Sequence, residues 1–412
     1  MKKIKISQFY SGASENEHNN NTSFNYKMGG FDIYSDIGKL IPLKENVTQT
    51  LDGNSISDYE LSDFENTNFG GLYSESYNVA IGYDTASNTR ATLYKESTTE
   101  GVWNKNVNGV NSYQKGTMTL YRGVPVVLTK GGGNTYYVER FNSLISSTVV
   151  YNVTADYSPS ILPQMLVHPL DDILYTAIGN KIYTWDDTTQ YLGIELPKDR
   201  EVTSLFAYGS YLGIATRKRS GYGKSIVYLW GRDRSLATLQ EQIDFGEGDL
   251  MIAEVLGGAI FGISEEIRND KYFAVIRSYS GGESQIFKEI EIESNLLNLK
   301  KKTQNKLYFA VRNSDTLYSL FKNKTGSYSL TKSFFAANGA IAQTVSGFSI
   351  LNDRLFLTYA DNTDYYTTAQ TQSNPNYTDV SYYTTTENPG IDSDDLSKKK
   401  NLKKVYITVK PK

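Results

Sequence analysis

Short apolar segments that follow a tight turn recur at a regular spacing along this chain. Four of them lie 48 residues apart, and three more precede them at spacings of 38, 48 and 46 residues. Their residues are strand formers, and a period of this size is typical of repeat architectures. The sequence therefore predicts seven repeats, with these residues at equivalent strand positions: Val79, Val126, Leu174, Leu212, Ile260, Tyr308 and Phe356.

Each repeat reads as four strands joined by turns. In the unit that begins near Thr203, Tyr208 to Ser210 and the stretch SGYGK mark two turns between strand-like runs. Glycine permits the positive φ that short hairpin turns require. Four antiparallel strands in 38 to 48 residues match one blade of a β-propeller. The sequence thus predicts an all-β fold, a seven-bladed β-propeller over residues 31–390.

The two chain ends are expected to lie outside the regular blades. Residues 1–30 are polar and rich in Asn and Ser, which favours an extended N-terminal arm. Residues 31–43 are strand-like but lack a nearby hairpin partner, so we expect them to close the ring on the blade formed by residues 345–387. Residues 391–412 contain many lysines and an alternating apolar series, which favours a C-terminal exit strand or connector.

Composition excludes several classes of protein. The chain has 412 residues and a formal net charge of -3, which does not favour specific nucleic-acid recognition. It contains no Cys, so disulfides and thiolate metal sites are excluded. The N-terminus lacks the apolar region of a signal peptide, and no apolar run has the length of a membrane span. We therefore expect synthesis in a cytoplasm without secretion or membrane insertion.

Histidine and glycine motifs do not identify a reaction. His18 and His168 are too far apart in the sequence to indicate a metal site or a relay, and both are expected in ordinary surface or turn positions. Gly223-Lys224-Ser225 imitates the end of a phosphate-binding loop but lies in a predicted hairpin turn. Gly131 to Gly133 likewise reads as a hairpin turn.

Acidic residues give no site either. Asp361 with Asp364, and Asp392 to Asp395, lack the Gly and terminal Glu of a calcium loop, so we expect solvated turns. With 45 acidic residues in the chain, counting neither excludes nor selects a pair for glycoside hydrolysis. The sequence thus predicts no catalytic, cofactor-binding or metal-binding residue and no cofactor.

Aromatic residues fall on successive predicted strands, where large rings fill the space between sheets. We expect the following to belong to the core: Tyr136, Tyr137, Tyr175, Tyr183, Trp185, Tyr228, Trp230, Tyr272, Phe273, Tyr318 and Phe321. A second group, Tyr365-Tyr366 with Tyr382-Tyr383, lies among Thr and Asn and is a candidate surface for stacking on sugar rings.

Both ends of the chain resemble a known protein family. The opening KIKISQFYSGA, the Asn-rich arm and GGFDIYSDIGKLIPL resemble the start of propeller-bearing virion proteins of tailed bacteriophages. Phe31 to Ile33 and Gly38 to Leu43 carry this match, and KKKNLKKVYITVKP resembles the segment that leaves the ring. The resemblance implies a structural subunit of the tail or its nozzle.

The sequence therefore favours a structural virion component of a bacteriophage tail that acts through assembly contacts, not catalysis. Its expected partners are other tail proteins and copies of itself in a homo-oligomeric ring. Two alternatives stay open: a lectin-like propeller that binds a host-surface glycan, and a propeller glycoside hydrolase. A hydrolase would place several carboxylates and an Arg on the innermost strands. We expect those strands to be rich in Ala, Leu, Ile, Gly and Thr instead.

Overall fold

The computed structural model gives an all-β protein. Its described part contains 34 strands and no helix. None of the described residues belongs to a helix with the length and apolarity of a membrane span. The structure describes residues 27–29, 31–32, 41–42, 46–51, 54–55, 59–69, 75–84, 90–111, 114–221, 223–232, 239–312, 314, 316–322, 326–334, 344–352, 354–361, 364–370 and 381–383.

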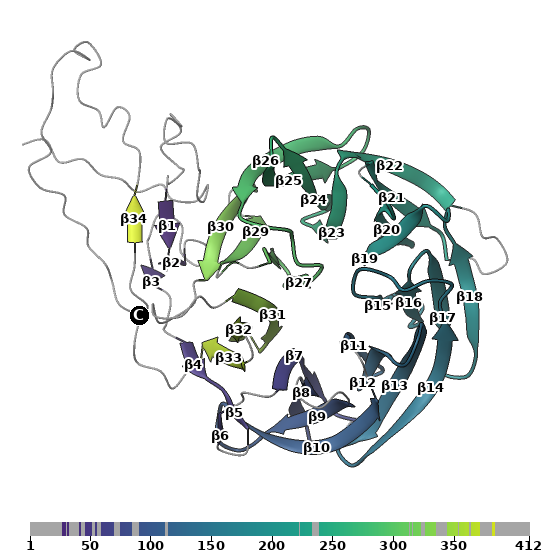
Figure 1. Ribbon diagram of the computed structural model, residues 1–412, viewed down its shortest axis with the longest axis vertical. Coiled ribbons are helices and arrows are strands. Elements are labelled where there is room, and N and C mark those ends of the chain that lie inside the picture. Colours follow the sequence, from purple (N-terminus) through teal and green to yellow (C-terminus); the bar gives the residue numbers. More distant parts are fainter. Residues whose placement is uncertain are drawn as a thin grey trace, which may run out of the picture.

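Seven four-stranded antiparallel units form the blades of a β-propeller around a common centre (Figure 1). In blades 1 to 6 the strands run from the centre outward in sequence order. Blade 1 contains β7 (Tyr59–Thr67), β8 (Tyr77–Asp84), β9 (Arg90–Glu96) and β10 (Val102–Asn111). Blade 2 contains β11 (Gln114–Tyr121), β12 (Val124–Lys130), β13 (Thr135–Ser143) and β14 (Ser146–Thr154). Blade 3 contains β15 (Gln164–Val167), β16 (Leu174–Ile178), β17 (Lys181–Trp185) and β18 (Gln190–Glu195).

The remaining blades complete the ring. Blade 4 contains β19 (Arg200–Tyr208), β20 (Tyr211–Lys218), β21 (Lys224–Trp230) and β22 (Leu239–Glu247). Blade 5 contains β23 (Asp249–Leu256), β24 (Ala259–Arg268), β25 (Lys271–Tyr279) and β26 (Gln285–Ile292). Blade 6 contains β27 (Lys301–Lys302), β28 (Lys306–Ala310), β29 (Leu317–Lys322) and β30 (Tyr328–Phe334). Blade 7 contains β31 (Thr344–Leu351), β32 (Arg354–Asp361), β33 (Asp364–Gln370) and, from the other end of the chain, β4 (Asn46–Thr48).

The seven apolar positions found in the sequence all lie on the second strand of a blade, which confirms the repeat. The seven side chains do not all point to the same side of their sheet. Leu174, Leu212 and Ile260 pack against the preceding blade. The other four pack against the following blade: Val79, Val126, Tyr308 and Phe356. A shift of one residue along a strand reverses the face of its side chains, so these seven positions are not in phase with one another. The expected residue-by-residue equivalence is therefore wrong.

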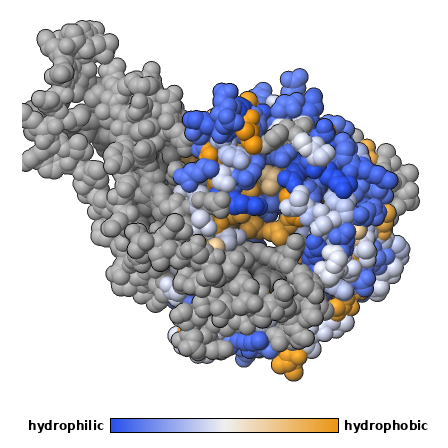
Figure 2. Space-filling model, viewed as in Figure 1, coloured by the Kyte–Doolittle hydropathy of each residue, from blue (hydrophilic) through white to orange (hydrophobic). Residues whose placement is uncertain are grey.

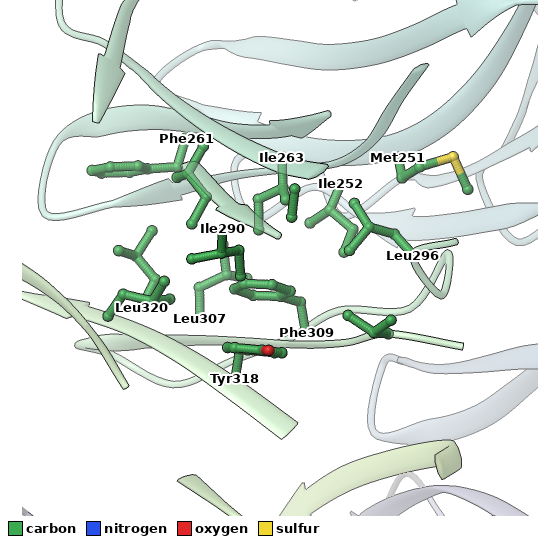
Figure 3. Close-up of a cluster of buried hydrophobic side chains, with 14 of the residues drawn as sticks. Met251, Ile252, Phe261, Ile263, Ile290, Leu296, Leu307, Phe309, Tyr318 and Leu320 are labelled. Carbon is green, nitrogen blue, oxygen red and sulfur yellow. The ribbon is translucent and has the colours of Figure 1, made fainter. Parts of the chain in front are cut away.

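Buried side chains fill each interface between neighbouring blades. Between blades 5 and 6, Phe261 and Ile263 of β24 face Leu307 and Phe309 of β28 (Figure 3). Most aromatic residues expected in the core are buried there, whereas Tyr137, Tyr272 and Phe273 are half-buried. Stacked radial sheets bury apolar surface in the way that the hydrophobic effect favours.

The strand that closes the ring differs from the expected one. The β4 strand pairs antiparallel with β33, so that Thr48 lies opposite Thr368. Within the expected segment 31–43, β2 (Phe31–Asp32) pairs with β3 (Ile41–Pro42). Closure by a segment that precedes the first blade is thus confirmed, but the pairing of residues 31–43 with the last blade is wrong. A pattern of apolar residues does not distinguish a closing strand from a local hairpin.

The chain continues from the closing strand directly onto blade 1. Gln49 donates its amide to the Thr367 carbonyl at 2.7 Å, and Thr50 donates to the Gly101 carbonyl at 2.9 Å. Two short strands, β5 (Thr50–Leu51) and β6 (Asn54–Ser55), then add to the outer edge of β10. One segment therefore fastens blade 7 to blade 1, and we call residues 46–51 the closing segment.

Truncation tests this closure. A chain that begins at residue 46 keeps the closing segment and is expected to melt close to the temperature of the full-length protein. A chain that begins at residue 52 leaves β33 and β10 as unpaired edges, which promote aggregation. Size-exclusion chromatography and thermal melting compare the two. Equal behaviour of both truncated chains would contradict the assignment of residues 46–51 as the closing segment.

Short strands also pair near the chain ends. Here β1 (Lys27–Gly29) lies antiparallel to β34 (Ser381–Tyr383). The rest of the expected arm, residues 1–26 and 30, and the expected exit strand, residues 391–412, lie outside the described residues.

Candidate functional site

The innermost strands carry charged residues, contrary to expectation. Asp63 lies on β7, Glu201 on β19, Asp249 and Glu254 on β23, and Lys301 on β27. The Ala-, Leu- and Gly-rich runs that we expected at the centre are the second strands. Each of these is covered on both faces by neighbouring blades, which explains its apolar composition.

The connection that leads into blade 6 places the side chain of Lys300 against blade 5. The Lys300 Nζ lies 2.7 Å from Glu254 Oε2 and donates to the carbonyls of Leu205 and Ala253 at 2.7 Å each. Lys302 lies 3.2 Å from the other Glu254 oxygen. Burial raises the pKa of Glu254, but the two ammonium groups outweigh this effect and hold the pKa below its ordinary value. The carboxylate is therefore neutralised from two sides.

A second lysine spans the space between non-adjacent blades. Lys301 of blade 6 lies 2.8 Å from Asp63 and 4.0 Å from Glu65, both on blade 1. The other Asp63 oxygen accepts the Met118 amide of blade 2 at 3.0 Å. Burial raises the pKa of Glu65, and the nearby Lys301 charge opposes this rise. This contact links three blades across the inner side of the ring.

Two connections between blades also reach toward the centre: residues 155–163 and residues 293–300. Asn298 donates to the Leu162 carbonyl at 3.3 Å, so the two connections touch. Ile161 packs against the apolar cluster between blades 5 and 6. Figure 2 shows hydrophobic residues in the hollow at the centre of the ring, framed by hydrophilic residues. We call these two connections, together with the inner charged side chains that they contact, the channel mouth.

The connection formed by residues 155–163 is held in place by Glu201 and Arg217. Ser160 donates its amide to Glu201 at 2.9 Å and its hydroxyl at 3.1 Å. Arg217 contacts Glu201 at 3.0 Å and lies 3.7 Å from Asp249. Burial raises the pKa of Asp249, and the Arg217 charge opposes this rise. One Asp249 oxygen is buried and accepts no hydrogen bond from the described residues. Asp249 is therefore the least satisfied carboxylate of this group.

The motifs singled out in the sequence do not gather at the channel mouth. Gly131 to Gly133 and Gly223 lie in turns between strands, as predicted. His168 lies in the turn between β15 and β16, which agrees with the expected surface or turn position, and it is buried there. Its Nε2 lies 3.2 Å from the Tyr211 carbonyl, and its Nδ1 accepts the Leu170 amide. Burial lowers the pKa of His168, with the Arg232 charge adding to this effect.

Other candidates fall on parts that are not described. Asp361 and Asp364 face each other across the hairpin between β32 and β33, but their side chains are not described. The side chains of Tyr365-Tyr366 and Tyr382-Tyr383, together with His18 and Asp392 to Asp395, also lie outside the described residues. Within the described part of the chain, no group of three or more His, Asp or Glu side chains has a metal-binding arrangement.

Comparison with known proteins supports the fold alone. No protein-family model and no curated protein matches this sequence. The solved structure of YCF48 bound to a D1 peptide is similar, with a TM-score of 0.50 at 10% identity over 82% of this chain and 98% of that one. The WD40 domain of Toxoplasma gondii coronin gives 0.48 at 10% identity, covering 82% and 90%. BamB from Moraxella catarrhalis gives 0.44 at 12% identity, covering 85% and 98%.

Proposed function

We propose that this protein is a structural component of a bacteriophage virion, a tail or tail-nozzle subunit that acts through assembly contacts. The resemblance of residues 31–43 and of the C-terminal segment to phage propeller proteins supports this role. The proposal that the protein acts without catalysis is supported by the contacts at the channel mouth. Ser160 and the Lys300 to Lys302 run pair with carboxylates of the innermost strands, so these carboxylates are engaged within the chain instead of facing a substrate.

Partner binding is compatible with this fold. YCF48, which has a similar fold, was solved with a bound peptide. The proposed partners here are other tail proteins and further copies of the chain in a ring of rotational symmetry. Localisation in the virion tail follows from the same proposal.

Quantitative mass spectrometry of purified phage particles tests this role. We expect several copies of the protein per particle, in a fixed ratio to the other tail proteins. Particles that infect normally but lack the protein would overturn the proposal.

A glycoside hydrolase is the second candidate, because the channel mouth does hold two carboxylates and an arginine. Glu201 is committed to Ser160 and Arg217, however, which leaves Asp249 as the available acid. Glycoside hydrolysis ordinarily requires two carboxyl groups. One available acid therefore favours the structural role.

The variant Asp249→Asn separates these two functions. We expect the wild-type protein to release no sugar from glycoside substrates, and the variant to enter virions normally. Turnover that is lost in Asp249→Asn would establish the hydrolase instead. Binding to a glycan array without incorporation into particles would favour the lectin-like alternative.

A further inference from the structure

Cationic side chains cluster at one end of blade 4. Lys198 and Arg200 lie at the connection that leads into β19, and three more cations flank the turn between β20 and β21. Backbone contacts hold these two loops together, because the Arg219 amide donates to the Asp199 carbonyl at 2.7 Å. Arg200 also donates to the Lys224 carbonyl. We call these five residues the basic patch: Lys198, Arg200, Lys218, Arg219 and Lys224.

The charge of the basic patch is only partly neutralised. Lys224 pairs with Asp244 at 2.6 Å, and Glu247 lies opposite Lys224 on the neighbouring strand. Two carboxylates lie on the other side of the patch: Asp199, and Asp156, which pairs with Lys181 at 2.8 Å and also interacts with the Lys198 charge. Arg219 lies 3.6 Å above the Tyr157 ring and so is held by an aromatic face, not by a carboxylate.

The position of the basic patch indicates that it serves an external partner. Lys198, Arg219 and Lys224 are exposed, and Arg200 and Lys218 are partly exposed. The chain as a whole carries a formal net charge of -3, whereas cations outnumber anions in the basic patch. Clustered surface charge of one sign attracts a partner of the opposite sign and increases its rate of association.

The shape of the patch favours a short partner. It occupies the connection from blade 3 to blade 4 and one adjacent loop of blade 4. A nucleic acid ordinarily contacts a longer cationic track, and a single strand also stacks its bases on aromatic platforms. The described ring beside the patch, Tyr157, is already covered by Arg219. We infer that the basic patch docks a short acidic segment of a partner protein. This inference adds the chemistry of one partner to the proposed function, and it is measured on the isolated protein, independently of virion incorporation.

Binding of fluorescein-labelled decaglutamate to the full-length protein, followed by fluorescence anisotropy at low salt, tests the inference. The double variant Lys198→Glu/Lys218→Glu reverses two charges that make no ion pair among the described residues. We expect it to weaken binding at least about tenfold, because like charges then face the probe. The matched variant Lys105→Glu/Arg312→Glu changes the net charge equally, at exposed positions on other blades that make no ion pair among the described residues. It is expected to change binding by less than about twofold, since exposed charges far from the site are screened by salt.

Three results would overturn the inference: no saturable binding of decaglutamate to the wild-type protein, an equal loss in both double variants, or tighter binding of an oligothymidylate of the same length. The last result would assign the patch to nucleic acid. Melting temperatures of both variants near that of the wild type ensure that a loss of binding is not a loss of folding.

Discussion

Replacing Trp103 with alanine is expected to lower the free energy of unfolding by about 3–5 kcal/mol, because a buried tryptophan leaves a large cavity. Trp103 is fully buried where blade 1 meets blade 7. Its ring lies edge-on to Phe64 at 5.1 Å and to Phe356 at 6.1 Å, and its indole N–H donates to Gln49 at 3.2 Å. The substitution therefore weakens the propeller at the interface between blade 7 and blade 1, where the two ends of the propeller join. Chemical denaturation measures the loss.

Trp230→Ala is the matched control for this prediction. Trp230 is equally buried, but it lies between blades 3 and 4. Both variants are expected to lose similar stability, whereas only Trp103→Ala should increase amide hydrogen exchange in β4 and β33. If exchange in these strands rises equally in both variants, the join between blades 7 and 1 has no special role in closure.

Replacing Glu254 with glutamine is expected to cost about 3–5 kcal/mol of stability, because it leaves a buried ammonium group without a counter-charge. Lys300 would then have only uncharged oxygen acceptors, among them the carbonyls of Leu205 and Ala253. The matched control is Glu291→Gln in the exposed pair with Lys271, which is expected to cost less than about 1 kcal/mol. Equal losses in the two variants would contradict the importance of the buried contact.

A double variant and the pH dependence refine this prediction. Lys300→Met with Glu254→Leu is expected to recover most of the loss, because an apolar pair often replaces a buried ion pair without cost. The pKa of Glu254 is lowered in the folded protein, so its contribution is present above the ordinary pKa of about 4.3 and is lost as the pH falls below it. The acid-side loss of stability should therefore be smaller in Glu254→Gln than in the wild type.

Much of the fold could be predicted from local patterns. The turns at Gly209 and at Gly257-Gly258 separate strands that the structure confirms, because glycine at a hairpin turn is a local signal. The closing strand could not be placed, since β4 has only three residues and its partner is far away in sequence. The equivalence of the seven strand positions failed because a shift of one residue along a strand reverses its faces and leaves almost no trace in composition.

The charged centre of the ring was missed because side-chain direction is not visible in a sequence. Lys300, Lys301 and Lys302 are consecutive in the sequence, yet Lys300 and Lys302 contact blade 5 while Lys301 contacts blade 1. Alternation along a strand separates them. Glu201 and Asp249 lie at or near the first position of an innermost strand. This position indicates a site at the centre of the ring only when it is known which strand of each blade is innermost.

The closing segment also determines when the protein can finish folding during synthesis. Thr48 leaves the ribosome before blade 1, but Thr368, its strand partner, emerges after six blades have been made. Until then β4 lacks its partner, and blades that are already formed must persist as an open arc. Such long-range pairing slows folding and exposes strand edges to other chains. The last blade is therefore the step at which neighbouring nascent copies compete with the correct N-terminal strand.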